Sequence, residues 1–166
     1  YFSKLGGSGT AEADCGTEKD PLKEYCNGGT QYNIASLAGR ADGIGGTEWD
    51  AATKNWQGGW RIPTIVEFNE LFNSDNCTKE WTSINGTAGM LVTSNKNGNS
   101  IFLPVAGIYS VIVQSKGTYG EYISSSPESS LYRYNGLYCG NYGGLFTQKT
   151  GMYRLYGYSI RPVIKL

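Results

Sequence analysis

Residues 89–104 read GMLVTSNKNGNSIFLP. Two runs rich in apolar residues flank an Asn-Gly pair at positions 97–98. Such a pair tolerates the positive φ angles of a tight turn and is the strongest short-range hairpin signal in a sequence. We therefore predict two antiparallel strands joined at Asn97-Gly98. The polar residues 95–99 are interpreted as this turn and not as oxygen ligands for a metal.

Two helix signals precede the hairpin. In the first, Thr47 and Asp50 form a capping box, and apolar residues recur at helical spacing until Gly58-Gly59 ends the turn. The pattern predicts a short amphipathic helix over residues 48–56. Its apolar positions are Trp49, Ala52 and Trp56.

The second helix signal starts after Pro63, which lies outside the helix, where its fixed φ does no harm. Thr64 can cap the helix, and Glu67 can reach back to Thr64 as in a second capping box. The apolar residues that follow share one helical face, so the segment predicts another amphipathic helix. They are Ile65, Phe68, Leu71 and Phe72.

Strand-forming residues and tight turns dominate the chain after the hairpin. Four further strands are predicted over residues 108–113, 119–125, 131–139 and 158–164. Residues 1–46 contain many glycines and no clear period, which predicts loops. Two short helices followed by an antiparallel β-rich half indicate one α+β domain over residues 1–166, with the helices packed on the sheets.

The composition excludes several kinds of catalytic site. The chain has 166 residues, of which 24 are glycine, 13 are tyrosine and none is histidine. Without histidine the chain has no Ser-His or Cys-His nucleophile, no imidazole acid or base and no His-ligated metal. No pair of carboxylates is placed for acid-base work, so we expect a protein that is not an enzyme and needs no cofactor.

Charge and hydropathy exclude two classes of partner. The formal net charge is zero, and charged residues make up only 17% of the chain. Residues 101–166 carry six Lys or Arg and two Asp or Glu, a surplus too dilute for a nucleic-acid interface. No apolar run approaches the roughly 20 residues of a membrane-spanning helix, so we expect no direct membrane insertion.

The cysteines and the acidic cluster favour structural interpretations. Cys15 and Cys26 lie close enough in the sequence to form a bridge, but buried or free thiols are the better interpretation, also for Cys77 and Cys139. A solvated acidic face is the better interpretation of the N-terminal carboxylates, and an oxygen-ligated calcium site is the alternative. These carboxylates are Asp14, Glu18, Asp20 and Glu24.

Tryptophans and isolated arginines near the helices also favour structural roles. Trp56, Trp60 and Trp81 are expected to anchor helices to the sheet, with an aromatic sugar-stacking platform as the alternative. Arg61 and Arg161 are each surrounded by apolar residues. We expect both guanidinium groups to be half-buried and to donate bidentate hydrogen bonds.

Residues 131–158 have the composition of a recognition surface. The segment mixes tyrosine with Gly, Asn and Ser and contains only three charged residues. Tyrosine offers a large ring and a hydroxyl, while Gly, Ser and Asn let loops adapt to a ligand. Because tyrosine also suits strands, alternate rings are expected to cover the core. We predict a mixture of buried and displayed rings.

A set of motifs extends from about residue 47 to the end of the chain. It comprises Asp50-Ala51-Ala52, Trp56, Gly59-Trp60-Arg61-Ile62-Pro63-Thr64, Glu67-Phe68, Leu71, Asn76-Cys77, Trp81, residues 97–104, Ala106-Gly107 and residues 157–163. In these motifs and their spacing, the chain resembles the bacterial surface-protein family called the major paralogous domain, or FISUMP. The resemblance implies a C-type-lectin-like fold of the formylglycine-generating-enzyme subtype.

The same resemblance implies a location and a way of varying the surface. Members are extracellular, often lipoproteins or adhesin modules, which implies a bacterial or phage-encoded surface protein, lipid-anchored through a region before Tyr1. In some members a diversity-generating retroelement randomises adenines, which turns Asn codons into mixtures rich in Tyr, Asn, Ser and Gly. Residues 131–158 resemble such a variable region. The sugar-binding tripeptides of calcium-dependent lectins are absent, and no paired catalytic cysteines carry over.

The leading hypothesis is a non-enzymatic binding domain whose Tyr-rich face contacts a protein or another cell-surface ligand. The expected contact residues are Tyr132, Arg133, Tyr134, Asn135, Tyr138, Tyr142, Tyr153, Leu155, Tyr156 and Tyr158. A second hypothesis is a structural module of a fimbria or multidomain adhesin, in which these rings pack against a neighbouring domain. An oxidase of the formylglycine-generating type is the weakest, and likeness of fold alone cannot choose among the three.

Overall fold

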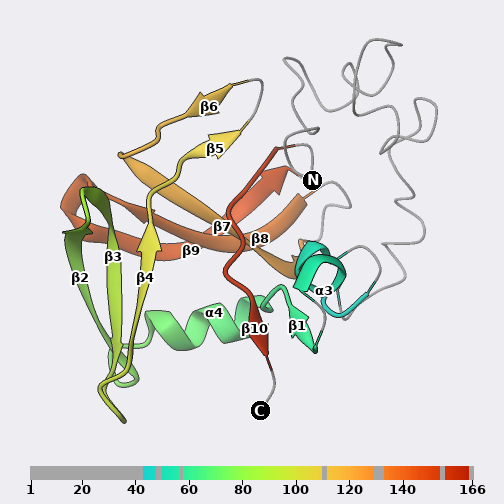
Figure 1. Cartoon of the computed structure of the whole chain (residues 1–166), viewed down its shortest axis with the longest axis horizontal. Coiled ribbons are helices and arrows are strands. Elements are labelled where there is room, and N and C mark those ends of the chain that lie inside the picture. The colour runs from blue at the N-terminus through green and yellow to red at the C-terminus, as the bar shows by residue number, and fades with distance from the viewer. Residues whose placement is uncertain are drawn as a thin grey trace.

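The computed structural model describes most of the chain from residue 43 onward and shows an α+β architecture, as predicted (Figure 1). The described residues are 43–47, 50–56, 58–109, 112–128, 133–153 and 156–164. The elements in chain order are α3 (Ala51–Trp56), β1 (Trp60–Arg61), α4 (Ile65–Phe72), β2 (Cys77–Ile84), β3 (Thr87–Ser94), β4 (Ser100–Pro104), β5 (Ile108–Tyr109), β6 (Val113–Gln114), β7 (Tyr119–Pro127), β8 (Arg133–Gly140), the 3-10 helix η3 (Tyr142–Gly144), β9 (Leu145–Tyr153) and β10 (Val163–Ile164). Cys15, Cys26 and the four N-terminal carboxylates lie outside the described residues.

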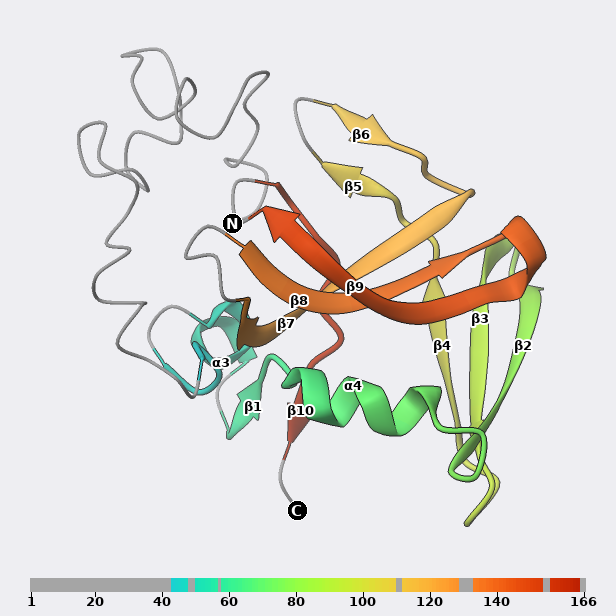
Figure 2. The same ribbon diagram turned by 180° about the vertical axis from the view of Figure 1, so that it is seen from behind.

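Helix α4 begins as the sequence predicts. The Thr64 hydroxyl accepts the N–H of Glu67 at 3.2 Å, and the Glu67 carboxylate accepts the N–H of Thr64 at 2.8 Å, which completes the capping box. Phe68 is fully buried, and the other apolar residues of the predicted face pack around the same core. In both views, α4 lies along one side of the β7–β8–β9 sheet (Figures 1 and 2).

Helix α3 is shorter than predicted, because it begins at Ala51 and not at residue 48. The carboxylate that caps its first turn belongs to Asp50, which accepts the N–H groups of Ala52 at 2.8 Å and Thr53 at 3.2 Å. Asp50 therefore takes the N-cap position that the sequence pattern assigned to Thr47. Trp49 lies outside the described residues.

The predicted Asn97-Gly98 hairpin is confirmed, since β3 and β4 pair antiparallel on either side of it. A strand that the sequence analysis missed, β2, pairs with the other edge of β3. Its turn is Asn85-Gly86, with φ angles of 50° and 76°. These two positive values suit a tight two-residue hairpin turn, for which Asn-Gly is favoured. The chain therefore uses the same turn signal twice.

The second three-stranded sheet has the order β7-β8-β9. Two of its strands lie close to predicted segments, whereas β9 was not anticipated because its residues mix apolar and polar types without clear alternation. In the middle of the sheet, Tyr138 on β8 lies opposite Glu121 on β7 and Thr147 on β9. The β5-β6 hairpin projects on the side of this sheet away from α4 (Figures 1 and 2).

Two predicted strands are broken into shorter pieces. Residues 108–113 include β5 and the first residue of β6, and these two short strands pair antiparallel. Residues 158–164 contribute β10 and an isolated bridge from Ser159 to Tyr122 on β7. Strand β10 pairs with β1, so that Ile164 lies opposite Trp60. The last described residues thus return to the segment between the two helices.

The core consists of two clusters of buried side chains. The first lies between α4 and the two large sheets and contains Phe68, Cys77, Met90, Val92, Leu103, Val105, Tyr122, Leu137 and Cys139. The second lies between α3, β7 and β8 and contains Ala52, Ile62, Ile123, Tyr134, Met152 and Tyr158. Burial of this apolar surface is the main force that holds the sheets and helices together.

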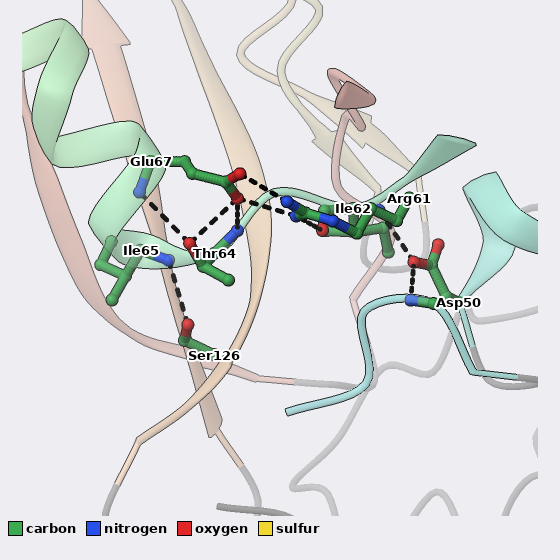
Figure 3. A network of polar contacts seen from close by, with 8 residues as sticks. Asp50, Arg61, Ile62, Thr64, Ile65, Glu67 and Ser126 are labelled. Atoms are coloured by element: carbon green, nitrogen blue, oxygen red, sulfur yellow. Dashed lines mark hydrogen bonds and ion pairs between the residues drawn. The ribbon is translucent and has the colours of Figure 1, made fainter. Parts of the chain in front are cut away.

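A polar network connects the two helices to β7 (Figure 3). Arg61 donates two hydrogen bonds to the Glu67 carboxylate, at 2.8 and 2.5 Å, as expected for a half-buried bidentate arginine. This pairing lowers the pKa of Glu67 to about 2. At the same end of α4, the N–H of Ile65 donates to the Ser126 hydroxyl at 3.0 Å. Position and orientation of α4 are therefore set by both its own cap and β7.

Several structural expectations for single residues need correction. Trp56 and Trp60 are exposed, because α3 and β1 turn them outward, and only Trp81 packs against the first core cluster. Arg161 is exposed and not half-buried. Cys77 and Cys139 are buried free thiols, as predicted, and burial raises the pKa of Cys139 to about 11.

Candidate functional site

The alternation of side chains along β8 divides the predicted contact residues into two faces. Leu137 and Cys139 are fully buried in the core cluster that includes Phe68 of α4. Because neighbouring residues of a strand point to opposite faces, Tyr138 points away from α4. By the same rule, Arg133 and Tyr134 leave opposite faces of the strand. A continuous surface of all predicted residues is therefore excluded by the strand itself.

Two of the predicted contact residues belong to the core. Tyr134 is 3% exposed and Tyr158 is 6% exposed, and both pack in the second cluster with Ile123 and Met152. Burial raises the pKa of Tyr158. The prediction that these two rings are displayed to a ligand is wrong, because residues from other segments, among them Ala52, cover them. The predicted mixture of buried and displayed rings is confirmed.

Half-buried Asn135 on β8 forms hydrogen bonds to β7. Its side-chain amide donates to the carbonyl of Pro127 at 3.1 Å, and its backbone carbonyl accepts the Ser124 hydroxyl at 2.7 Å. These bonds tie β8 to β7 where the register of the two strands shifts. Half-buried Asn135 therefore has its amide group occupied within the sheet.

A group of four residues, the Tyr138 group, occupies the face away from α4. The rings of Tyr119 and Tyr138 stack with their centroids 5.4 Å apart. The ammonium of Lys149 lies 5.8 Å from the centroid of the Tyr138 ring and 3.6 Å from the carboxylate of Glu121. Three neighbouring strands thus bring two rings, one carboxylate and one ammonium together.

The electrostatics of the Tyr138 group follow from its partial burial. Burial raises the pKa of Glu121, while the nearby Lys149 partly offsets this effect. Desolvation also raises the pKa of Tyr138, and neighbouring Tyr119 and Glu121 raise it further. The Tyr138 hydroxyl is therefore neutral near pH 7 and can both donate and accept a hydrogen bond.

A second set, the Arg133 group, lies where β8 begins and β9 ends. The guanidinium of Arg133 donates to the Tyr153 hydroxyl at 2.6 Å, and its central carbon lies 4.5 Å from the centroid of that ring. Tyr153 meets Tyr156 edge to face at 5.8 Å, and Tyr156 meets Tyr158 at 6.4 Å. Arginine and aromatic contacts together hold the half-exposed rings in place.

The two groups are linked through a buried ring. The ring of Tyr158 lies 6.4 Å from that of Tyr156, and its pKa is raised mainly by burial and further by nearby Glu121, Tyr156 and Tyr119. Tyr142, which begins η3 in the turn between β8 and β9, is 82% exposed. The candidate site therefore consists of the displayed tyrosines of these two groups together with Tyr142.

The structure adds three residues that the sequence analysis did not assign to the site: Tyr119, Glu121 and Lys149. A signal for Glu121 was present, since it is one of only two acidic residues after position 100 and stands in a predicted strand rich in apolar and small residues. Its partner could not be identified without the pairing of β7, β8 and β9. Tyr132 and Leu155, which were predicted to contact a ligand, lie outside the described residues.

The arrangement suits binding by aromatic contact, hydrogen bonds and a charged pair. Within the described part of the chain, no group of three or more His, Cys, Asp or Glu residues could hold a metal ion. Neither α-helix among the described residues has the length and apolar character needed to cross a membrane. The chain matches no protein-family model, no curated protein and no solved structure.

Proposed function

We propose that this chain is a non-enzymatic, extracellular ligand-binding domain of the FISUMP type, built on a C-type-lectin-like scaffold. Its displayed tyrosines on β7, β8 and β9 contact a protein or another cell-surface ligand. The face is open to retroelement diversification, because most of its rings lie within residues 131–158. The resemblance of the motifs and the display of these rings support the proposal.

The observation that carries it is the fixed, half-exposed state of Tyr138 and Tyr153. Tyr119 stacks on the ring of Tyr138, and the guanidinium of Arg133 packs over the ring of Tyr153. A ring that is already immobilised loses little conformational entropy when it binds, and its hydroxyl can still donate a hydrogen bond to a polar partner. Fully exposed Tyr142 extends the same surface.

The direct test replaces the displayed rings and leaves the core unchanged. A Tyr138→Ala, Tyr142→Ala, Tyr153→Ala variant and the wild type are applied to an array of surface proteins and glycans. We expect the triple variant to lose at least about 2 kcal/mol of binding free energy toward any ligand that the wild type binds, since aromatic anchors dominate interfaces. A control variant, Val66→Ala with Ile84→Ala, changes exposed apolar residues that do not belong to the candidate site and should bind normally. Equal binding by the triple variant would refute the proposal.

The diversification part has a separate genomic test. A near-repeat of the coding segment for residues 131–163 should lie beside a reverse transcriptase gene and differ from it only at adenines. A genome without this repeat would leave a binding domain of fixed specificity and remove only the retroelement from the proposal.

A second candidate function is a structural module of a fimbria or adhesin. One observation favours it: Trp56, Trp60 and Ile164 are exposed apolar residues on α3, β1 and β10, and the last two lie opposite each other in the β1-β10 pair. Exposed apolar patches often mark contacts between domains. Self-association in size-exclusion chromatography that Trp56→Ser with Trp60→Ser abolishes would favour assembly, and a monomer with intact ligand binding would favour recognition.

A further inference from the structure

The carboxylate of Glu121 is nearly buried, and its positively charged partner lies too far away for a short hydrogen bond. Its side chain is 9% exposed, and the Lys149 ammonium lies 3.6 Å away. A charge-assisted hydrogen bond between an ammonium and a carboxylate measures about 2.7–2.9 Å. Lys149 therefore provides charge compensation without the short contact that a well-seated ammonium would make.

Lys149 is placed so that it can leave this position. Its side chain is 43% exposed, and it belongs to β9, the outer strand of the β7-β8-β9 sheet. A lysine side chain is long and flexible, and its ammonium is well hydrated in water. Rotation of Lys149 into solvent would change no backbone pairing and would remove the positive partner of Glu121.

The position that the Lys149 ammonium now occupies has the features of a cation site. One side is the Glu121 carboxylate, and another is the face of Tyr138, whose centroid is 5.8 Å from the nitrogen. Tyr119 stacks on Tyr138 and holds that ring in place. A carboxylate together with an aromatic face attracts an ammonium by charge and by the quadrupole of the ring.

We propose that the Tyr138 group binds an alkylammonium ion, as carried by a lysine side chain of a partner protein, which displaces the Lys149 ammonium from Glu121. This inference rests on the proposed function, because it names the chemistry that the same surface recognises. Lys149 competes with the ligand for Glu121. In the free protein its positive charge balances the charge of the buried carboxylate, and this lowers the affinity of the site for weakly binding cations. A ligand succeeds when its ammonium makes the shorter hydrogen bond that Lys149 does not make.

The test uses n-butylammonium as the probe and isothermal titration calorimetry as the measurement. We expect Lys149→Met to bind n-butylammonium at least roughly tenfold more tightly than the wild type, because the competitor is gone and the carboxylate lacks a partner. The double variant Glu121→Gln, Lys149→Met should lose this gain. Lys96→Met, which removes an exposed lysine from the β3-β4 turn, is the matched control and should behave as the wild type. Neutral n-butanol should bind none of the variants tightly.

Two results would overturn the inference. One is equal affinity of the wild type and Lys149→Met for n-butylammonium, and the other is retention of the gain after Glu121→Gln. If Lys149→Met does not fold, the NMR signal of the Lys149 ammonium in the wild type decides: it should shift toward that of a free lysine as n-butylammonium is added. An unchanged signal at saturating amine would contradict displacement.

A second arm distinguishes the sources of the ammonium group. Tighter binding of Nα-acetyl-lysine N-methylamide than of n-butylammonium assigns the site to a peptide-borne lysine, and tighter binding of n-butylammonium overturns that assignment in favour of a free amine. No macromolecular partner takes part in these measurements. If n-butylammonium does not bind as expected, the test of the proposed function with the triple tyrosine variant is unaffected. Loss of partner binding in that variant can in turn occur with or without an ammonium site.

Discussion

The carboxylate of Asp50 accepts a hydrogen bond of 2.8 Å from the backbone N–H of Ile62, twelve positions further along the chain (Figure 3). The same carboxylate accepts the N–H groups of Gly46, Ala52 and Thr53. Asp50 is fully buried, so each of these amides would be without an acceptor if the carboxylate were removed. One side chain thus fixes the start of α3 against the segment that leads into α4.

Replacement of Asp50 by alanine should therefore destabilise the protein strongly. We expect a loss of about 2–4 kcal/mol in the free energy of unfolding, because several buried amides lose their partner. Urea denaturation measures this loss. Asp75→Ala, at an exposed position, is the control and should change the stability by less than about 0.5 kcal/mol. A similar effect of both variants would show that the Asp50 network contributes little.

The Arg61–Glu67 pair predicts a dependence of stability on pH. The guanidinium of Arg61 and the N–H of Thr64 lower the pKa of Glu67 from 4.5 to about 2. A carboxylate with a lowered pKa in the folded state stabilises the fold above its unfolded pKa, and this stabilisation is lost as the pH falls toward the folded value. We expect the loss between about pH 4.5 and pH 2.

Thermal unfolding of the wild type and of Glu67→Gln over this pH range measures the effect. The melting temperatures of the two proteins should differ most near pH 6 and converge as the pH approaches 2. Glu70→Gln, an exposed position on the same helix, should keep the wild-type dependence. A constant difference between wild type and Glu67→Gln at every pH would contradict the role of this ion pair.

Gly136 in β8 should tolerate no side chain. A Cβ atom added there would lie 2.4 Å from the carbonyl oxygen of Tyr122 and would also overlap Met152. Since the backbone oxygen belongs to the paired strand β7, Gly136→Ala should cost about 2–4 kcal/mol through overpacking and displaced strands. Gly144→Ala, where φ is +66° and no atom lies within 4 Å, should cost only about 1 kcal/mol. Chemical denaturation of both variants tests this order.

Two tyrosines from the same part of the sequence should respond in opposite ways to truncation. Tyr134→Ala removes a buried ring from the second core cluster and should cost about 3–5 kcal/mol of stability. Tyr142→Ala removes an exposed ring and should change stability by about 0.5 kcal/mol or less, while it weakens ligand binding. Equal melting temperatures of the two variants would contradict the division into core and displayed rings.

Local signals in the sequence predicted the local parts of the fold. The Thr64–Glu67 capping box and the Asn97-Gly98 turn depend on residues within a few positions of one another, so the pattern alone was sufficient. Asn85-Gly86 is the same kind of turn signal, although the β2-β3 hairpin around it was not predicted. Strand β9 could not be recognised, because its residues show no regular alternation and its pairing with β8 supplies the missing constraint.

The sequence predicted a tyrosine-rich candidate site, but only some of the predicted tyrosines are displayed. Tyrosine enrichment in residues 131–158 indicated a recognition surface, and Tyr138, Tyr142 and Tyr153 are displayed in the structure. Tyr134 and Tyr158 are not, because residues from distant segments, among them Ala52 of α3, pack over them. The face that α4 and α3 occupy depends on packing between distant segments, which residue patterns along the chain do not reveal.

By itself, the sequence determined the α+β class, the absence of histidine chemistry, one helix cap and one hairpin, since each depends on residue types or on neighbours in the chain. Only the tertiary structure decided that Glu121, Tyr138 and Lys149 lie together, because they come from three strands whose register is set by long-range hydrogen bonds. The physical reason is the range of the interactions: turn and cap energies act over a few residues, whereas burial and strand pairing select partners across the whole domain.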